Sequence, residues 1–279
     1  MGEEADFRRD PGNRALDKYS RMLHKEVLKG KSKTPHVAMV ELDGNIHAAG
    51  NSGKRRVTED DSIEAQERIL KITEPEATQD SQEHNDDERM KKDISKLSAL
   101  REGTYHSDEN ESVNLRGIKE AIENNSIQWH QLDKREQKNG SKHGEMALHE
   151  EISEHAGRNK RPQNKKKEDI YVGGVKKDCL FCQWAHAILN EYVYAELGYQ
   201  VLTSGTHGEA FSNWIAPQEL LDNEKALAAF KEKLEKLDHT DDSGTWEMEN
   251  GKVDKKPKGN YQKTKGNSHS PYELTGRQP

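Results

Sequence analysis

Apolar residues recur along the chain with two spacings, and each spacing predicts a different kind of element. Near the N-terminus, apolar side chains stand three or four residues apart, which predicts an amphipathic helix. These residues are Leu16, Tyr19, Leu23 and Val27, and Gly30 follows them as a stop signal. Two short apolar runs then flank Asp43–Gly44, a dipeptide typical of tight hairpin turns. We therefore expect a hairpin with strands at 36–42 and 45–49.

The second half of the chain alternates between helical periodicity and short apolar runs. Helices are expected at 144–157, 178–198 and 218–237, and strands at 169–177 and 199–205. Strands that alternate with helices predict an α/β sandwich rather than an all-helical bundle.

An acidic block with few aromatic residues separates the hairpin from this half. Residues 59–111 carry 17 acidic and 7 basic side chains, a net charge of −10. Segments 58–72 and 88–103 have the character of short helices, but we expect the block as a whole, about 58–112, to be a largely disordered insert. A helix followed by a strand is expected within 113–132.

Composition limits how much of the chain can form a packed core. Hydrophobic residues make up 30% of the sequence and charged residues 34%. Counting glycine raises the apolar share to only about 38%, against about 45–50% in ordinary domains. We therefore expect one modest domain at 33–237, preceded by a helix and linker at 1–32. The polar tail at 238–279 is basic, and we expect it to be disordered.

We expect no secretion signal and no membrane span. The first residues contain no apolar run, and no stretch approaches the roughly 18 apolar residues that a span needs. The cytoplasm is the default compartment, with a secreted or delivered effector as the alternative. In a reducing compartment, two cysteines separated by two residues indicate redox or metal chemistry rather than a disulfide framework.

Two short motifs contain the residue types of a zinc site. "HGE" places His143 two residues before Glu145, and "CLFC" holds Cys179 and Cys182, the two cysteines of the chain. One imidazole and two thiolates leave a fourth position for water, as in catalytic zinc sites. Each motif lies where a predicted helix begins, and the positive end of a helix favours thiolates. Glu145, near the metal without being a ligand, has the chemistry of a proton shuttle. A redox pair or inert thiols are the alternatives.

Together these motifs resemble the signature of the zinc-dependent nucleobase deaminases, H-x-E followed after a gap by P-C-x-x-C. "HGEMALHEE", "YVGGVKKDCLFC" and "SGTHGEAFSNWIAP" are similar to segments of bacterial polymorphic-toxin-type nucleic-acid deaminases and their eukaryotic relatives. The resemblance extends over about 33–237, with the acidic block as an interruption. It implies a three-layer α/β/α cytidine deaminase-like sandwich with a mixed sheet and one Zn²⁺ per chain.

The resemblance also implies the roles of single residues. The metal ligands would be His143, Cys179 and Cys182, and the catalytic residue would be Glu145. Asn51, in "AAGNSG", matches the substrate-binding Asn of many relatives, and His207 is a second candidate for substrate contact. The implied reaction is hydrolytic deamination, with a zinc-activated water attacking C4 of cytosine in DNA or RNA. The alternatives are adenine deamination and a catalytically inactive zinc-binding module of the same fold.

Several residues near the motifs have simpler expected roles. Asp178 stands where the common pattern has Pro, and we expect it to cap the helix that follows. His149 and His155 lie six residues apart and do not share a helix face, so we expect both at the surface. We expect Trp214 to pack in the core, with base stacking as the minor alternative. The basic loop 160–167 is expected to be solvated, with phosphate contact as its alternative.

The partners implied by the resemblance are macromolecules. Single-stranded or duplex DNA, or RNA, is the expected substrate, and a toxin would also require an immunity or inhibitor protein. The sequence leaves the oligomeric state open.

Overall fold

The computed structural model describes residues 10–29, 36–51, 59–74, 87–104, 113–130, 140–238 and 244–257. Gly30, the stop signal expected after the first helix, lies outside the described residues, as do parts of the acidic block and of the tail.

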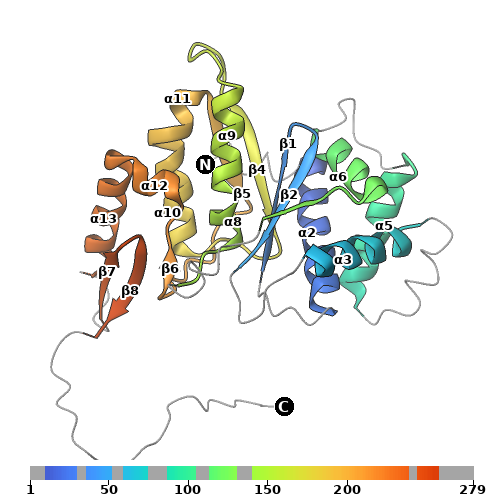
Figure 1. Cartoon of the computed structure of the whole chain (residues 1–279), viewed down its shortest axis with the longest axis horizontal. Coiled ribbons are helices and arrows are strands. Elements are labelled where there is room, and N and C mark those ends of the chain that lie inside the picture. Colours follow the sequence, from blue (N-terminus) through green and yellow to red (C-terminus); the bar gives the residue numbers. More distant parts are fainter. Residues whose placement is uncertain are drawn as a thin grey trace, which may run out of the picture.

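Five strands form a mixed sheet in the order β3-β2-β1-β4-β5 (Figure 1). Their bounds are Val37–Leu42 for β1, Asn45–Gly50 for β2, Gln128–His130 for β3, Glu168–Gly174 for β4 and Tyr199–Thr203 for β5. Strand β1 is antiparallel to β2 and β4, whereas β3 is parallel to β2 and β5 is parallel to β4. The other four strands therefore all end at the edge of the sheet where β1 begins, and the segments that follow them meet there.

The expected hairpin is confirmed, and its turn has the expected geometry. Residues of β1 and β2 pair from Val37 with Gly50 to Leu42 with Asn45. Asp43 has φ 54° and Gly44 has φ 84°. A two-residue turn of this kind requires positive φ at both positions, which explains the Asp-Gly sequence.

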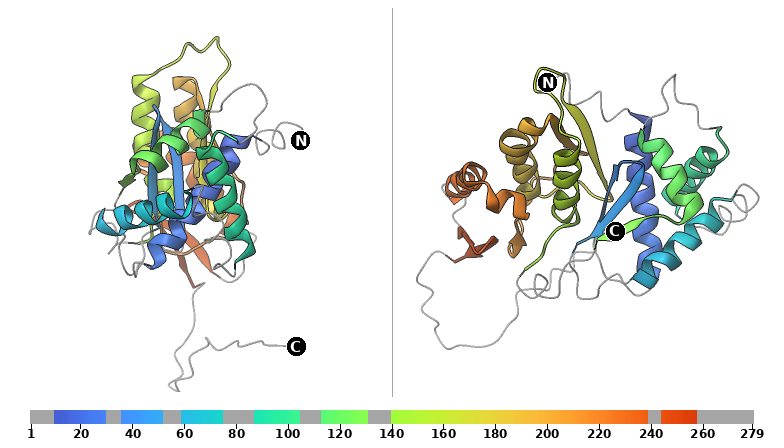
Figure 2. Two further views of the ribbon diagram at one scale, coloured as in Figure 1. Left: turned by 90° about the vertical axis from the view of Figure 1, so that its right-hand side faces the viewer. Right: turned by 45° about the horizontal axis from the view of Figure 1, so that its top comes forward.

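Helices cover both faces of the sheet, as the expected α/β sandwich requires (Figure 2). Along β1, Val37 and Met39 are buried on one face, and Ala38 and Val40 on the other. On the first face, here the α2 face, the strands are covered by α2 (Pro11–Lys29) and α6 (Val113–Asn124), and α3 (Glu59–Ile72) and α5 (Glu88–Arg101) pack on these two helices. The second, here the α10 face, carries the helices that follow residue 143. Successive side chains of a strand point to opposite faces of the sheet, so a sheet that is buried on both faces separates two cores.

The short helices expected within the acidic block are confirmed at 59–72 and 88–101, so the block is more ordered there than the expectation of a largely disordered insert allowed. Both segments form helices, and both contribute to the core of the α2 face. Each buries only a few apolar residues, such as Ile69 in α3 and Ile94 in α5. Buried charges here are paired, since Arg21 donates two hydrogen bonds of 2.9 Å to Asp93. The high average polarity of the block concealed one apolar side on each helix, and that side is sufficient for packing against α2 and α6.

The helices of the α10 face come from several separate segments of the chain. They are α8 (Gly144–Ala147), α9 (His149–Arg158), α10 (Leu180–Leu189), the π-helical turn η1 (Asn190–Tyr194), α11 (Ala195–Leu197), α12 (Gln218–Asp222) and α13 (Glu224–Asp238). The helix expected at 178–198 thus begins at Leu180 and contains a π-helical turn, and it ends at Gly198 with φ 83°. The helix expected at 218–237 is divided by Asn223, whose backbone is extended.

The expectation of a disordered tail is wrong for 245–256. Strands β7 (Thr245–Glu249) and β8 (Lys252–Lys256) form a hairpin, and β8 also pairs with β6 (Trp214–Ile215). Trp246 and Val253 are buried, and the burial of these two apolar residues holds the otherwise polar hairpin against the domain. Among the described residues, no helix combines the length and the apolar content needed to cross a membrane.

Candidate active site

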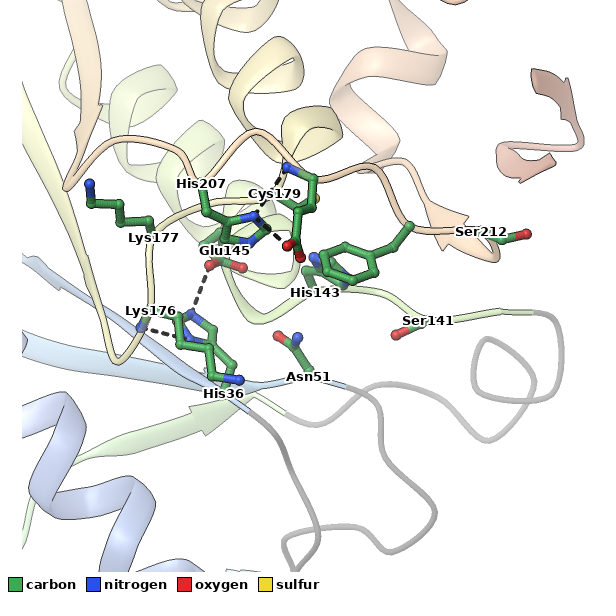
Figure 3. Close-up of a pocket in the computed structure, with 12 residues that line it drawn as sticks. His36, Asn51, Ser141, His143, Glu145, Lys176, Lys177, Cys179, His207 and Ser212 are labelled. Atoms are coloured by element: carbon green, nitrogen blue, oxygen red, sulfur yellow. Dashed lines mark hydrogen bonds and ion pairs between the residues drawn. The ribbon is translucent and has the colours of Figure 1, made fainter. Parts of the chain in front are cut away.

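The two motifs meet at the edge of the sheet where β2, β4 and β5 end. His143 is the residue before α8, and Cys179 is the N-cap of α10. Cys182 lies one turn into α10, on the same side as Cys179. The ligand atoms of these three residues lie within 4.8 Å of one another. Figure 3 shows His143, Glu145 and Cys179 facing the same space, with Asn51 and His36 on the side of the sheet.

Both motifs are fixed by contacts that the sequence order does not reveal. The backbone N–H of Gly144 donates a hydrogen bond of 2.7 Å to Asn51 Oδ1, which ties α8 to the end of β2. The Cys179 sulfur accepts a hydrogen bond of 3.4 Å from the backbone N–H of Cys182. The expectation that Asp178 caps α10 is therefore wrong. Asp178 lies one residue too early, and the sulfur of Cys179 occupies the capping position.

The cluster has the spacing of an open tetrahedral metal site. Cys179 Sγ lies 3.3 Å from Cys182 Sγ, and Cys182 Sγ lies 3.3 Å from His143 Nδ1. Zinc–ligand bonds of 2.0–2.3 Å imply tetrahedral separations of about 3.5–3.8 Å, so small movements would accommodate an ion. Both thiols are free and buried. Two sulfurs and one nitrogen suit zinc, and these residues could hold a metal ion beside the cavity, which His143 and Cys179 line.

Charge within the cluster also fits a cation. Hydrogen bonding from Cys182 lowers the pKa of Cys179 to about 5, with His143 adding to the effect against the opposing influence of burial. Burial raises the pKa of Cys182 well above its usual value, and the neighbouring Cys179 adds to this. Burial alone would lower the pKa of His143, but Cys179 beside it raises the pKa overall. The imidazole of His143 thus favours the thiolate form of Cys179, which is the form that a metal ligand requires.

Glu145 is held by His36, a residue that the sequence reasoning missed. The backbone N–H of Lys176 donates to His36 Nδ1 at 3.2 Å, so a neutral His36 carries its proton on Nε2. That nitrogen lies 2.7 Å from Glu145 Oε1. Burial would raise the pKa of Glu145, but the neighbouring His36 and then His143 hold it below its usual range. His36 precedes the first strand and belongs to neither motif, so its role emerges only in the folded chain.

The second carboxylate oxygen of Glu145 has a different environment. Glu145 Oε2 is buried and has no hydrogen-bond partner among the described residues. Glu145 also lines the cavity described below. A buried acceptor without a partner is costly, so this oxygen is suited to contact a water or a substrate in the cavity.

A cavity of about 450 Å³ opens in front of the cluster. Asn51 and His207, the two expected substrate-contact residues, both line it, together with Lys176, Lys177 and Phe211. The last three had not been singled out in the sequence. Phe211 is 41% exposed, and its ring centroid lies 6.0 Å from that of His143. The cavity therefore combines an exposed aromatic ring, two lysines and the carboxylate of Glu145.

The loop that carries His207 is pinned to the start of α10. The backbone N–H of Asp178 donates to Gly205 O at 2.8 Å, and the N–H of His207 donates to Asp178 O at 3.1 Å. The His207 ring accepts a hydrogen bond from the N–H of Glu209 through Nδ1, at 3.2 Å. This pairing orients the ring at the wall of the cavity, where its other nitrogen can donate.

Trp214 packs in the core as expected, and it also touches the cluster. Its side chain is fully buried, and Nε1–H donates a hydrogen bond of 3.3 Å to Cys182 Sγ. An N–H donor at a sulfur stabilises the thiolate form that a metal requires. The basic loop 160–167 lies before β4, at the end of that strand remote from the cavity, and most of it is exposed. This position fits a solvated loop.

The expectation that His149 lies at the surface is wrong. His149 is fully buried, and its Nδ1 lies 2.6 Å from the hydroxyl of Tyr194. Its Nε2 lies 3.1 Å from His186 Nδ1. The other nitrogen of His186 lies 3.6 Å from the Asp178 carboxylate, next to Cys179. A buried polar chain therefore connects η1 and α9 to the beginning of α10. His155, in contrast, lies near the surface and pairs with Asp43 at 3.0 Å.

Comparison with known proteins gives one match. Residues 142–218 match the model of the family described as OTT_1508-like deaminase. No curated protein and no solved structure matches the chain. The matched segment contains His143, Glu145, Cys179 and Cys182 and extends through the loop of His207. Over residues 142–218 the chain is therefore similar to a deaminase family of the cytidine deaminase-like type, and the structure places this segment in a mixed α/β fold.

Proposed function

We propose that the protein is a zinc-dependent hydrolytic deaminase that converts cytosine to uracil in DNA or RNA. The observation that carries this proposal is that His143 and Cys179, which form one cluster with Cys182, line the same cavity as Glu145. Zinc, when bound, would supply a water whose pKa is lowered toward neutrality. The three ligands would come from the starts of two helices, so their spacing is set by packing on the sheet.

Glu145 would move protons within the reaction. Its pKa lies below its usual range, so it enters the reaction as a carboxylate and can accept a proton from the attacking water. It would then donate this proton to the ring nitrogen of the base and assist the departure of ammonia. His36 would keep one oxygen of the carboxylate fixed while the other, Oε2, exchanges protons. His36 is therefore a positioning residue.

The walls of the cavity support a nucleobase as the substrate. Phe211 offers an exposed ring on which a base can stack, and His207 and Asn51 offer polar groups for its edge. Lys176 and Lys177 are exposed at the same cavity, where they would contact phosphate. These features favour a base within a phosphate-bearing strand. They apply to adenine as well as to cytosine, because adenine would meet the same metal and the same acid.

The decisive experiment replaces Glu145 by Gln. Purified protein is incubated with DNA and RNA pools and with free nucleosides, and the products are sequenced or separated for C-to-U and A-to-I changes. We expect the wild type to convert cytosine, and Glu145→Gln to lose at least about 100-fold in rate while retaining zinc. The control is Glu154→Gln, an exposed carboxylate of α9. Unchanged activity in zinc-loaded Glu145→Gln would refute the catalytic assignment, and A-to-I products would reassign the base.

A second variant tests the positioning role of His36. His36→Ala should retain zinc but lower kcat about 10-fold, with a smaller loss in His36→Gln, which can still donate to Glu145. Without His36, burial raises the pKa of Glu145, so the acid limb of the pH–rate profile should move to higher pH. An unchanged profile would assign His36 a purely structural role.

A further inference from the structure

A second group of metal-binding side chains lies away from the deaminase cavity, at the β3 edge of the sheet. His47 belongs to β2, His130 is the last residue of β3, and Glu151 lies in the first turn of α9. Ile46 and Ala48 are buried in the core of the α2 face. His47 therefore points to the opposite face, toward α9. Three elements distant in sequence thus bring two imidazoles and a carboxylate together.

The distances within this group are those of potential ligands to one ion. His47 Nδ1 lies 2.9 Å from His130 Nε2, and the two rings are nearly parallel, with centroids 5.1 Å apart. The Glu151 carboxylate lies 3.8 Å from His47 Nδ1 and 3.2 Å from Nδ1 of His130, which is the other nitrogen of that ring, so an ion would bind one of the two nitrogens in place of its present contact. One ligand atom from each residue lies within 4.8 Å of the others. Among the described residues, only this group and the cysteine cluster meet that criterion.

The chemistry and the exposure of the group favour a transition-metal ion. Two imidazole nitrogens and one carboxylate oxygen are a ligand set that zinc accepts, with water in the fourth position. Burial lowers the pKa of His47 to about 4, so its ring is neutral near pH 7 and keeps a lone pair for a ligand bond. The side chains of His130 and Glu151 are 25% and 27% exposed, so an ion can reach them from solvent.

The group is separate from the deaminase cavity. None of its three residues lines that cavity. His47 precedes Asn51 by four residues along an extended strand, a separation of about 13 Å. The neighbouring charges are Asp43, which pairs with His155, and Arg158, which lies 3.9 Å from Asp43. One carboxylate and one guanidinium there offset each other, so the ligands themselves decide whether a cation binds.

We propose that His47, His130 and Glu151 form a second metal site, for a divalent ion of the zinc type, which fastens strand β3 to helix α9. Strand β3 has only three residues and pairs with β2 alone. An edge strand this short gains little from its ladder. A metal bound by one residue from each of β2, β3 and α9 would cross-link the sheet edge to the layer above it.

Metal stoichiometry tests the proposal in the full-length protein. After loading with zinc and removal of excess metal, the wild type should retain two equivalents. His130→Ala and Glu151→Gln should each retain one, and a Cys179→Ser/Cys182→Ser double variant should also retain one. The matched control Glu154→Gln, an exposed carboxylate on the same helix, should retain two. A single equivalent in the wild type that disappears in the cysteine variant would overturn the proposal.

Cobalt distinguishes the two sites without relying on the folding of the cysteine variant. Co²⁺ bound by thiolates has an intense sulfur-to-metal charge-transfer band, whereas a site of nitrogen and oxygen ligands has none. His130→Ala should therefore lose one equivalent of Co²⁺ while the charge-transfer band keeps its full intensity. An equal Co²⁺ content in wild type and His130→Ala would show that the two histidines share only a hydrogen bond, and the proposal would fail.

Discussion

At the scale of single residues, buried histidines set the acid stability of this protein. His149 and His186 are almost completely buried on the α10 face and contact each other at 3.1 Å. Burial lowers the pKa of His149 well below its usual value and that of His186 to about 4. Both rings are therefore neutral in the folded chain at pH values where an exposed histidine is charged.

This burial predicts a loss of stability in mild acid. Unfolded histidines bind protons near pH 6.5, whereas folded His186 stays neutral until about pH 4 and the pKa of folded His149 lies well below its usual value. Between these values the unfolded state binds more protons, so the free energy of unfolding falls as the pH falls. Each histidine contributes about 1.4 kcal/mol per pH unit within that window. Urea unfolding of the metal-free protein between pH 7 and pH 4.5 measures the slope.

Replacing His149 tests whether this residue contributes to the dependence of the unfolding free energy on pH. His149→Gln keeps hydrogen-bonding groups beside Tyr194 but cannot titrate. The slope of its unfolding free energy against pH should therefore be smaller than that of the wild type by the contribution of one histidine. Ser153→Ala, on the same helix, is the control and should keep the wild-type slope. If His149→Gln also kept it, His149 would have to be accessible to protons in the folded state.

At the scale of elements, the approach of α8 to the sheet sets the position of the motif. A Cβ atom on Gly144 would lie 2.5 Å from the backbone oxygen of Ala49 and 3.2 Å from the backbone nitrogen of Ala38. Both neighbours are backbone atoms of paired strands and cannot move aside easily. Glycine between His143 and Glu145 thus allows the short helix to lie directly on β1 and β2.

A methyl group at this position should therefore displace the site. Gly144→Ala is expected to push α8 from the sheet, destabilise the fold by about 1–3 kcal/mol and lower the zinc content. Gly157→Ala is the matched control, because a Cβ atom there meets nothing within 4 Å. Chemical unfolding and metal analysis of both variants check the expectation. Equal zinc content and equal stability in the two variants would contradict it.

At the scale of the whole molecule, an aromatic cluster joins the C-terminal hairpin to the cysteine helix. Phe181, the residue before Cys182, lies 5.1 Å from Trp246 of β7 and 5.8 Å from Trp214, measured between ring centroids. Trp214 also stacks on Phe230 of α13 at 5.2 Å. On β8, Asp254 accepts a hydrogen bond of 2.9 Å from the backbone of Asn213, next to the cavity wall. The hairpin therefore supports one side of the cavity.

Removing the aromatic ring of the hairpin should affect the whole fold. Trp246→Ala leaves a void beside Phe181, and we expect the free energy of unfolding to fall by about 3 kcal/mol, with a loss of deaminase activity. Glu247→Ala, exposed on the same strand and paired with Lys256, should change stability by less than about 1 kcal/mol. Unfolding curves of the two variants make the comparison, and equal midpoints would show that the hairpin is dispensable.

The sequence by itself determined the parts that depend on local periodicity and spacing. The hairpin at Asp43–Gly44, the alternation of strands and helices, and the four-residue metal and acid set follow from patterns a few residues long. The chemistry of a metal site requires those residue types at those spacings. The structure confirms the fold class and brings His143, Cys179 and Cys182 together.

Tertiary structure alone decided the features that depend on partners distant in sequence. His36 reaches Glu145 only because β1 begins at the edge where α8 starts, and His149 is buried only because η1 brings Tyr194 to it. Helices in the acidic block and the hairpin at 245–256 are ordered by burying a few apolar residues against surfaces that other elements supply. Average composition cannot reveal such a surface, because the free energy of burial depends on which faces meet.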